Sequence, residues 1–574
     1  MRVNLLAFAC FSVLKRERHF IFESGIELNF TRLLEQRACD SADQLAYRYL
    51  PNDREERCLT HGQLVAGAHG LAAVIRRSIP PGQRVVLLYP AGLQFIQAFF
   101  ACLLANVVAV PLPLPKPNDA AHRLDHVIKD CEPAAIFTET SFFEQISALL
   151  PDAYRSTVAT TDANFECARI IRSHVTAERD VAVLQYTSGS TSKLKGVMLR
   201  NANIFANLRQ IELAFGHSRE SSGVTWLPHY HDMGLVGGIL QPLFAGFPVT
   251  LLSPISFIQR PLRWLQAIHK YRATTSGGPN FAYDLCVAKA AGLEPHIDLT
   301  SWDLAFNGAE PVKASTLDAF SVTFRHAGFR RSAFVPCYGL AEATLIVAAV
   351  PKAEEPLTVE SYDSRITARG VTAPTRGQLV SCGPPAEGAF VQILRVNSEE
   401  HCEEGEVGEV FVVSPSVASG YWGKNDRAFR PGSPAAVRTG DFGFKLDGEL
   451  FITGRLSDLI VIRGKNLFPE DIEATMQIAQ PLLAQEGAAA FSVEGHATEQ
   501  LVLVQEVSSR TLRAVDLISM RDEVSRLVMQ RHGIGVSAFV PVRAGSLVRT
   551  SSGKISRFAC KQLYMTQKLL PLPM

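Results

Sequence analysis

Short apolar runs alternate with longer amphipathic segments over the first part of the chain. The runs are rich in β-branched side chains, as buried strands are, whereas segments 92–104 and 201–215 have a helical spacing of apolar positions. Alternation of this kind is typical of parallel sheets covered by helices. We therefore predict an α/β fold with strands at 85–89, 107–110, 134–137, 181–184 and 248–252.

The pattern changes twice toward the C-terminus. From about residue 383 to 451, short alternating strands with Gly and Asp turns predict a smaller β-rich subdomain. Beyond it, an apolar run at 459–462, a helix from Pro469 and strands at 488–491 and 501–507 predict a separate α/β unit. The expected division is a large domain, residues 25–455, of two parallel-type α/β subdomains plus the β-rich one. A small mobile α/β domain, residues 456–574, follows and is called the lid below.

The N-terminus carries an apolar run, residues 3–14, but its basic residues follow the run. A signal peptide has the opposite order. We expect residues 1–24 to be a poorly ordered extension, with a weak membrane-surface anchor as the alternative. The apolar stretch 95–110 is too short to span a bilayer, so no stable membrane insertion is expected.

Composition narrows the class of protein. The 574 residues are 47% hydrophobic and carry 57 Lys+Arg against 56 Asp+Glu, a net charge of +1. Such a balance gives no general attraction to nucleic acid or to anionic membranes. The eleven cysteines form no C-x-x-C pair, which indicates reduced thiols and a cytoplasmic enzyme.

A loop rich in small and hydroxyl residues, 187–192, lies between the apolar strand 181–184 and two lysines, Lys193 and Lys195. Small residues let backbone N–H groups converge on an anion, and the lysines add charge, so the loop is suited to hold a polyphosphate. It lacks the spacing of a Walker A loop. A flexible turn is the alternative interpretation.

Five further motifs occur with this loop, at 226–238, 307–312, 336–344, 438–443 and 549–557. Together they resemble the adenylate-forming superfamily of acyl-CoA synthetases, peptide-synthetase adenylation domains and luciferases. The resemblance is strongest to its fatty acyl-AMP ligase branch and covers about residues 28 to 560. It implies activation of a medium- or long-chain fatty acid by ATP and Mg²⁺, giving an acyl-adenylate and pyrophosphate.

The resemblance also implies roles for individual residues. Lys554 is expected to be catalytic, Glu342 to bind Mg²⁺ and assist catalysis, and Asp458 to be the hinge of the lid. Nucleotide-binding residues are expected to be Thr187, Ser188, Gly189, Ser190, Thr191, Lys195, Gly308, Ala309, Glu310, Tyr338, Gly339, Asp441 and Arg455.

For the acid, the resemblance implies a pocket in which His231 closes the carboxylate end. The pocket residues are expected to be His231, Gly234, Gly237, Gly238, Ile239 and Phe281, and further apolar lining could come from Leu240, Phe244, Ile255 and Phe257, which could equally be ordinary core. His229 and His231 lack a third metal ligand. No Asp occupies the position that grips an amino acid's ammonium group in this superfamily, which favours a fatty acid.

A polar insertion at 351–377 also resembles the acyl-AMP ligase branch, in which it disfavours the use of CoA. The expected acceptor is therefore the phosphopantetheine thiol of a separate acyl carrier protein. An acyl-CoA synthetase is the near alternative, and an ordinary surface loop is the alternative for the insertion. A non-catalytic acyl or nucleotide sensor with the same fold is a second alternative.

Overall fold

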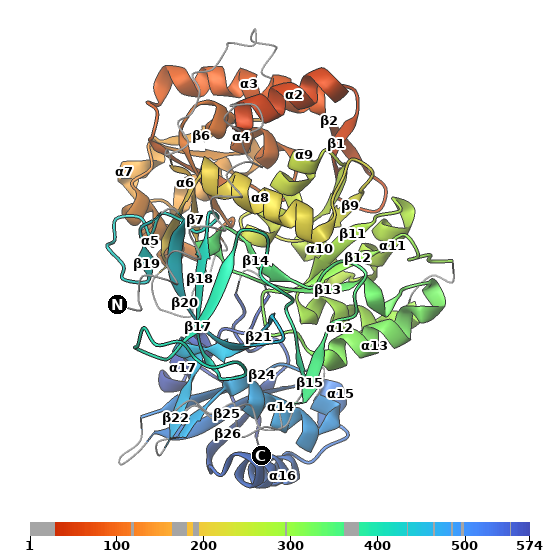
Figure 1. Cartoon of the computed structure of the whole chain (residues 1–574). Coiled ribbons are helices and arrows are strands. Elements are labelled where there is room, and N and C mark those ends of the chain that lie inside the picture. Colours follow the sequence, from red (N-terminus) through yellow and green to blue (C-terminus); the bar gives the residue numbers. More distant parts are fainter. Residues whose placement is uncertain are drawn as a thin grey trace, which may run out of the picture.

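The computed structural model describes residues 29–115, 120–162, 181–187, 194–292, 296–360, 378–432, 434–462, 465–483, 486–494, 499–550 and 553–573. The N-terminal extension, loop residues 188–193 and most of the insertion, 361–377, lie outside these ranges. Figure 1 shows a large body above a smaller C-terminal unit, with the β-rich strands at one side between them.

Two mostly parallel sheets form the body. The larger sheet has the order β14-β13-β12-β11-β9-β10-β1-β2, and only its outermost pairs are antiparallel. Its strands are β14 (Ile346–Ala349), β13 (Phe334–Gly339), β12 (Leu304–Asn307), β11 (Thr275–Gly278), β9 (Gly223–Thr225), β10 (Val249–Leu252), β1 (Leu45–Leu50) and β2 (Arg57–Thr60).

The second sheet has the order β6-β5-β3-β4-β7-β8, and its last pair is antiparallel. Its strands are β6 (Val158–Thr160), β5 (Ala135–Thr138), β3 (Arg84–Leu88), β4 (Val108–Leu112), β7 (Val181–Tyr186) and β8 (Gly196–Arg200). This arrangement confirms the predicted α/β class. It also places β7, which leads into the phosphate loop, beside β4 in the sheet interior.

Helices cover both sheets. The most apolar helix, α4 (Leu93–Leu104), is buried in a core to which both sheets contribute. The remaining helices of the body are α2 (Phe30–Ser41), α3 (His61–Ser78), α5 (Ala120–Cys131), α6 (Phe143–Leu149), α7 (Asp152–Arg155), α8 (Asn201–Phe215), α9 (Gln241–Ala245), α10 (Pro254–Gln259), α11 (Leu262–Lys270), α12 (Asn280–Ala288) and α13 (Ala314–Phe324). Between β9 and α9, the segment η2 (Met233–Leu240) is a π-helix, a form that often occurs at functional sites.

The β-rich subdomain is antiparallel. It contains β17 (Phe390–Leu394), β18 (Gly408–Ser414), β19 (Phe429–Arg430), β20 (Ala435–Leu446) and β21 (Glu449–Arg455). Two short strands, β15 (Thr358–Glu360) and β16 (Gln378–Val380), pair across the insertion. Val359 and Leu379 pack against an apolar cluster that also includes Phe468, so the base of the insertion reaches the start of the lid.

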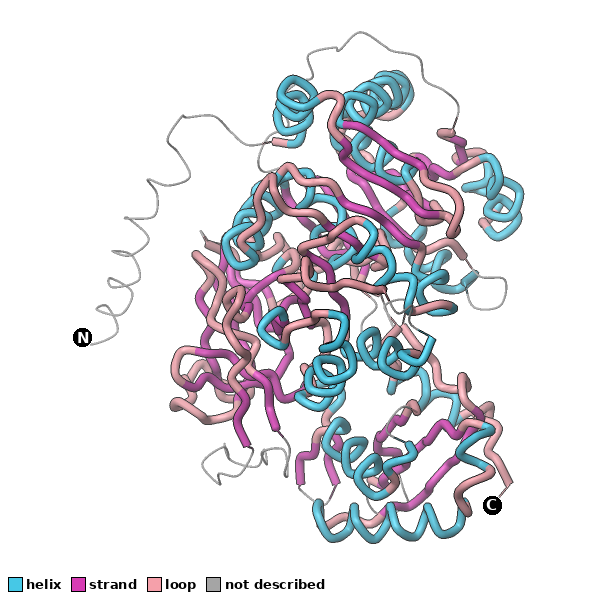
Figure 2. The backbone as a smooth tube through the Cα atoms, turned by 90° about the vertical axis from the view of Figure 1, so that its right-hand side faces the viewer, coloured by secondary structure: helices cyan, strands magenta, loops and turns pink. Residues whose placement is uncertain are grey.

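The lid has its own core. Its three-stranded sheet comprises β24 (Ala488–Val493), β25 (Gln500–Val507) and β26 (Val536–Arg543), and separate apolar clusters pack on its two faces. A two-stranded ribbon, β22 (Ile460–Ile462) and β23 (Lys465–Leu467), precedes it. The helices are α14 (Pro469–Ala479), α15 (Ser509–Leu512), α16 (Leu517–His532) and α17 (Arg557–Met565). Figure 2 shows this unit at the bottom of the molecule, below the larger body.

Candidate active site

A large cavity lies where the strand ends of the body meet the lid. Its volume is about 1930 Å³, and its walls include the carboxyl ends of β9, β12 and β13, the first residues of α12 after β11, and the lid loop before α17. Ligands of open α/β sheets generally bind at the carboxyl ends of the strands. Sixteen of the sequence-predicted site residues line this one cavity: Thr187, Lys195, His231, Gly237, Gly238, Phe281, Gly308, Ala309, Glu310, Tyr338, Gly339, Glu342, Asp441, Arg455, Asp458 and Lys554.

A buried carboxylate, Asp441 on β20, connects two of the predicted nucleotide-binding residues. The Tyr338 hydroxyl donates to Asp441 Oδ2 at 2.7 Å, and Arg455 Nε donates to Oδ1 at 2.8 Å. Arg455 faces Asp441 across the antiparallel pair of β20 and β21, so the sheet register produces the ion pair. Because a carboxylate has about four acceptor sites, Asp441 retains capacity for a ligand's hydroxyl groups.

Glu342 is half-buried, in a short 3₁₀ turn after β13. Burial raises the pKa of this carboxyl, and the Tyr421 hydroxyl, which donates to Oε1 at 2.7 Å, partly opposes that shift. Lys195 Nζ lies 4.3 Å from the centre of the Tyr421 ring and 3.0 Å from Asp426 Oδ2. A tyrosine therefore lies between the lysine of the phosphate loop and Glu342. The predicted loop residues Ser188, Gly189, Ser190 and Thr191 lie outside the described residues.

The turn after β12 is shaped for close backbone approach. A side chain at Gly308 would place a Cβ 2.8 Å from the carbonyl oxygen of Cys337, and Ala309 has a φ of 77°, which non-glycine residues rarely adopt. Asn280 fixes the turn: its Nδ2 donates to the Pro311 carbonyl at 2.9 Å, and its Oδ1 accepts from Lys313 N at 3.1 Å.

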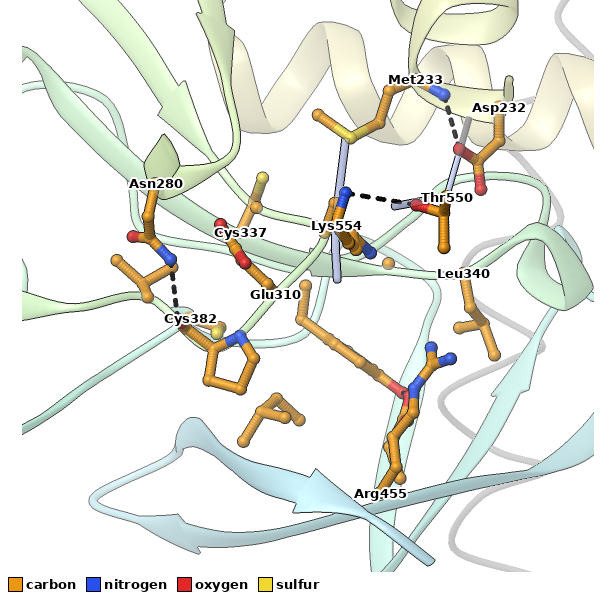
Figure 3. Close-up of a pocket in the computed structure, with 18 of the residues that line it drawn as sticks. Asp232, Met233, Asn280, Glu310, Cys337, Leu340, Cys382, Arg455, Thr550 and Lys554 are labelled. Atoms are coloured by element: carbon orange, nitrogen blue, oxygen red, sulfur yellow. Dashed lines mark hydrogen bonds and ion pairs between the residues drawn. The ribbon is translucent and has the colours of Figure 1, made fainter. Parts of the chain in front are cut away.

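Lys554 lies in the middle of the cavity, brought there by the lid (Figure 3). The backbone of Lys554 and Thr550 closes a tight loop, in which Lys554 N donates to Thr550 Oγ1 at 3.2 Å. Burial lowers the pKa of the Lys554 ammonium, Arg455 lowers it further, and the negative charges of Glu310 and Asp232 oppose the shift. Figure 3 shows Asp232, Glu310 and Arg455 around this lysine.

His231 and its neighbour Asp232 form a pair at the entrance to η2. Asp232 Oδ1 contacts His231 Nδ1, and it also accepts from Met233 N at 2.7 Å. Burial alone would raise the pKa of Asp232, but His231, Met233 N and Lys554 outweigh burial, and the pKa is lowered. By contrast, His229 is buried against Phe95, and desolvation lowers its pKa to about 3.

An apolar arm of the cavity, called the acyl arm below, runs along η2. Two residues predicted to line it, Gly234 and Ile239, do not. Gly234 packs so tightly that a Cβ there would lie 2.0 Å from the Pro228 carbonyl oxygen, and the Ile239 side chain is buried in the main core. Phe257 stacks on Trp226 in another core cluster, and Ile255 is 68% exposed. These residues are therefore core or surface residues. The sequence could not distinguish them from pocket residues, because a continuous apolar run does not show which positions face a cavity. Leu240 and Phe244 are likewise absent from the cavity wall.

The predicted hinge residue, Asp458, lies in the 3₁₀ turn η8 (Leu456–Asp458), directly after β21. Arg557 from α17 lies between three carboxylates, with its nitrogens 3.1 Å from Asp458, 2.7 Å from Glu470 and 2.7 Å from Glu473. Arg557 thus ties the end of the lid to its first residues.

Sequence reasoning missed Asp232, Asn280 and Tyr421. Asp232 directly follows His231 in a motif that was recognised, so its position next to a histidine was a usable signal. Asn280 and Tyr421 act through partners more than 25 residues away, and no local pattern could have indicated them. Among the described residues, no group of three or more His, Cys, Asp and Glu side chains is arranged to hold a metal ion.

Comparisons with known proteins identify the family of this chain. The family described as AMP-binding enzyme matches residues 34–422, and the one described as Disco-interacting protein 2-like, AMP domain, matches residues 457–572. The medium-chain-fatty-acid–[acyl-carrier-protein] ligase JamA of Moorena producens (strain JHB) is 38% identical, over 93% of this chain and 94% of that protein. The long-chain-fatty-acid–AMP ligase FadD32 of Mycolicibacterium smegmatis is 33% identical, over 92% of each.

The fold is also that of solved relatives. The fatty acyl-adenylate ligase from L. pneumophila, crystallised with acyl adenylate and pyrophosphate, is 34% identical, with a TM-score of 0.70 over 95% of this chain and 96% of that chain. Among the described helices, none combines the length and apolar character that a membrane-spanning helix requires. With a family match over most of its body and relatives aligned along nearly its whole length, the chain belongs to the AMP-binding enzyme family.

Proposed function

We propose that this protein is a fatty acid–AMP ligase that passes its acyl group to an acyl carrier protein. The observation that carries the proposal is a single cavity in which the lid lysine, Lys554, lies between the Tyr338–Asp441–Arg455 network and an apolar arm. An enzyme that joins a nucleotide to a fatty acid needs these three parts in contact. JamA is named as a ligase of medium-chain fatty acids and acyl carrier protein, and FadD32 as a ligase of long-chain fatty acids and AMP.

The nucleotide has a defined place in this proposal. Tyr338 would lie against the adenine, Asp441 would accept from the ribose hydroxyls, and the turn at Gly308 would pass close to the base. Thr187 and Lys195 lie at the cavity wall where the β- and γ-phosphates would extend. Lys195 supplies a positive charge there, held in position by Asp426.

The residues present also fit Mg²⁺. Glu342 is a half-buried carboxylate that forms no ion pair with a Lys or Arg in the described part of the chain, and its described hydrogen-bond partner is the Tyr421 hydroxyl. A hard divalent cation prefers oxygen ligands of this kind. Bound there, Mg²⁺ would neutralise part of the phosphate charge.

The chemistry follows from the charges. A carboxylate oxygen of the fatty acid attacks the α-phosphorus of ATP, a P–O bond forms, and the bond from the α-phosphorus to the bridging oxygen of the leaving pyrophosphate breaks. Lys554 would stabilise the negative charge that develops on the α-phosphate. Asp232 would orient the His231 ring, whose other nitrogen is then available to the acid's carboxylate.

For the second half-reaction, the proposed acceptor is a phosphopantetheine thiol. Its sulfur attacks the acyl carbonyl of the adenylate, and AMP leaves. The base of the insertion, β15 and β16, packs with Phe468 at the start of the lid, which supports a role for the insertion in limiting lid movement. We further propose that the lid begins at residue 456 and that Asp458 is its hinge. The described cysteines form no disulfide, which supports our proposal that the enzyme acts in the cytoplasm.

The direct test incubates purified protein, ATP and Mg²⁺ with saturated fatty acids of eight to sixteen carbons. Parallel reactions contain no acceptor, CoA, or a carrier protein bearing phosphopantetheine, and mass spectrometry follows acyl-AMP and acyl products. Acyl-AMP that persists with CoA and is consumed by the carrier protein is the expected result. Rapid conversion to acyl-CoA would instead show a CoA synthetase, and no product from any acid would refute the ligase proposal.

A further inference from the structure

The far end of the acyl arm is not purely apolar. Three polar side chains meet there: His217 after α8, Thr275 at the start of β11 and Gln241 at the start of α9. His217 and Thr275 line the cavity, and Gln241 lies behind His217. The aromatic residues around them are Phe215, whose ring centre lies 5.5 Å from that of His217, and Phe247, at 4.9 Å.

Strand direction shows that this cluster is distant from the reacting atoms. Thr275 is the first residue of β11, whereas Gly278 ends the strand and Phe281 follows it toward the lid. Since β9, β11 and β12 are parallel, their carboxyl ends all point to His231, Glu310 and Lys554. The four residues of β11 alone separate Thr275 from that end by about 10 Å.

The hydrogen bonds define which groups remain available. With the Gln241 amide oriented as in the structure, Nε2 faces His217 Nδ1 at 3.4 Å, and we assign Nδ1 as the acceptor because an amide nitrogen can only donate. His217 Nε2 then carries the proton and donates to Thr275 Oγ1 at 3.2 Å. Burial lowers the pKa of His217 to about 3, with Lys352 adding to the shift, so the ring is neutral as this arrangement requires.

In this arrangement, one donor and one acceptor have no hydrogen-bond partner among the described residues. The Thr275 hydroxyl accepts from His217, and its own proton has no acceptor among the described residues. Gln241 is completely buried, and its Oε1 has no hydrogen-bond donor among them either. A buried polar group without a partner is costly, and sites built to bind a hydroxyl commonly discriminate against the analogue that lacks it.

We propose that the acid activated by this enzyme carries a hydroxyl group near the end of its chain, and that Thr275 and His217 select it. This inference rests on the proposed ligase function and narrows its substrate class. The substrate hydroxyl accepts from the Thr275 hydroxyl, and the side chains of Phe215 and Phe247 pack against the methylenes beside it. A plain alkyl chain of the same length would leave the Thr275 proton unpaired.

The test compares ω-hydroxy acids with plain acids of equal length, from eight to sixteen carbons, by acid-dependent ATP–pyrophosphate exchange. At the preferred length, kcat/KM for the hydroxy acid should exceed that for the plain acid by about tenfold, the factor expected of one hydrogen bond. Thr275→Val keeps the shape and removes the donor, so that ratio should fall to one or below. His217→Phe should reduce that ratio as well.

Thr250→Val is the matched control, because Thr250 is also buried, on β10 of the same sheet, and does not line the cavity. Its ratio should equal that of the wild type. A wild-type preference for plain acids at every length, or an unchanged ratio in Thr275→Val, would overturn the inference and leave the ligase function intact. No exchange with any acid of either kind would refute the ligase function itself.

Discussion

At the residue scale, the charge of Lys554 is set by its surroundings. Burial and Arg455 favour the neutral amine, whereas Glu310, Asp232 and Asp441 favour the ammonium. Only the ammonium can stabilise a developing phosphate charge, so the balance between these groups should be visible in the kinetics. Burial is the largest influence, and the pKa is accordingly lowered.

We expect the rate of adenylation to fall at alkaline pH, with an apparent pKa below the ordinary lysine value of 10.5. Glu310→Gln removes a charge that raises the pKa of Lys554, so the falling limb should move to lower pH. Glu354→Gln, at an exposed glutamate outside the cavity, should leave the limb in place. If the alkaline fall in rate occurred at the same or a higher pH in Glu310→Gln, Lys554 would not be the group whose titration causes it.

Removing the Lys554 charge altogether should slow adenylation more than shifting its pKa does. An ammonium about 4 Å from a phosphate contributes ~4 kcal/mol at an effective dielectric near 20, so Lys554→Ala should slow single-turnover formation of acyl-AMP by roughly a thousandfold. ATP binding measured by calorimetry should remain. Lys568→Ala, at an exposed lysine of the lid, should retain the wild-type rate. Comparable rates in both variants would exclude Lys554 from the chemistry.

At the element scale, two glycines of η2 have different roles. At Gly237 an added Cβ would meet only Leu345 Cδ2, at an ordinary 3.4 Å, and the position lines the cavity. At Gly234 a Cβ would lie 2.0 Å from a backbone oxygen. One glycine therefore provides substrate volume and the other permits the chain to fold.

These positions predict opposite outcomes. Gly237→Ala should fold normally and lower kcat/KM for the longest acids by about tenfold, since one methylene in a pocket is worth roughly that much. Gly234→Ala should lower the free energy of unfolding by about 1–3 kcal/mol, measured by urea titration. If Gly237→Ala changed stability and not chain-length preference, the acyl arm would have to lie elsewhere.

Elements were predictable where their patterns were strong. Helix α8 has the predicted bounds, Asn201–Phe215, and α14 begins at Pro469 as expected. The family resemblance brought the site motifs together, and those at 226–238 and 307–312 follow parallel strands of one sheet, whereas 438–443 lies on antiparallel β20 and 549–557 lies in the lid. The sequence could not show that Ile239 points into the core, since every position in that run is apolar. Nor could it show the His217–Thr275 contact, which joins residues from separate elements.

At the scale of the whole molecule, an ion cluster joins the end of the lid to its first residues. Arg557 holds Asp458, Glu470 and Glu473 together near the proposed hinge. These carboxylates are half-buried, and removal of their shared cation would leave partly desolvated charges without a partner. The ion cluster should therefore contribute to the stability of the lid.

Arg557→Gln should lower the free energy of unfolding of the lid by about 1–3 kcal/mol, detected as a lower transition temperature in calorimetry. Arg526→Gln, at an exposed arginine on α16, should leave the transition unchanged. Equal transition temperatures for Arg557→Gln and the wild type would mean that the cluster contributes little.

The insertion gives a second prediction at this scale. Replacing residues 361–377 by a short Gly-Ser linker keeps β15, β16 and their contacts with the Phe468 cluster. If the insertion restricts the lid, the shortened enzyme should form acyl-CoA faster than the wild type and acyl-AMP at the same rate. Unchanged CoA reactivity in a folded variant would count against that role.

The most direct test of the whole account is acid-dependent ATP–pyrophosphate exchange, because exchange requires reversible formation of an acyl-adenylate. Exchange should depend on a fatty acid and on Mg²⁺, and it should be nearly lost in Lys554→Ala. If no acid supports exchange in the wild type, or if Lys554→Ala exchanges as fast, the cavity between body and lid is not the adenylation site that we propose.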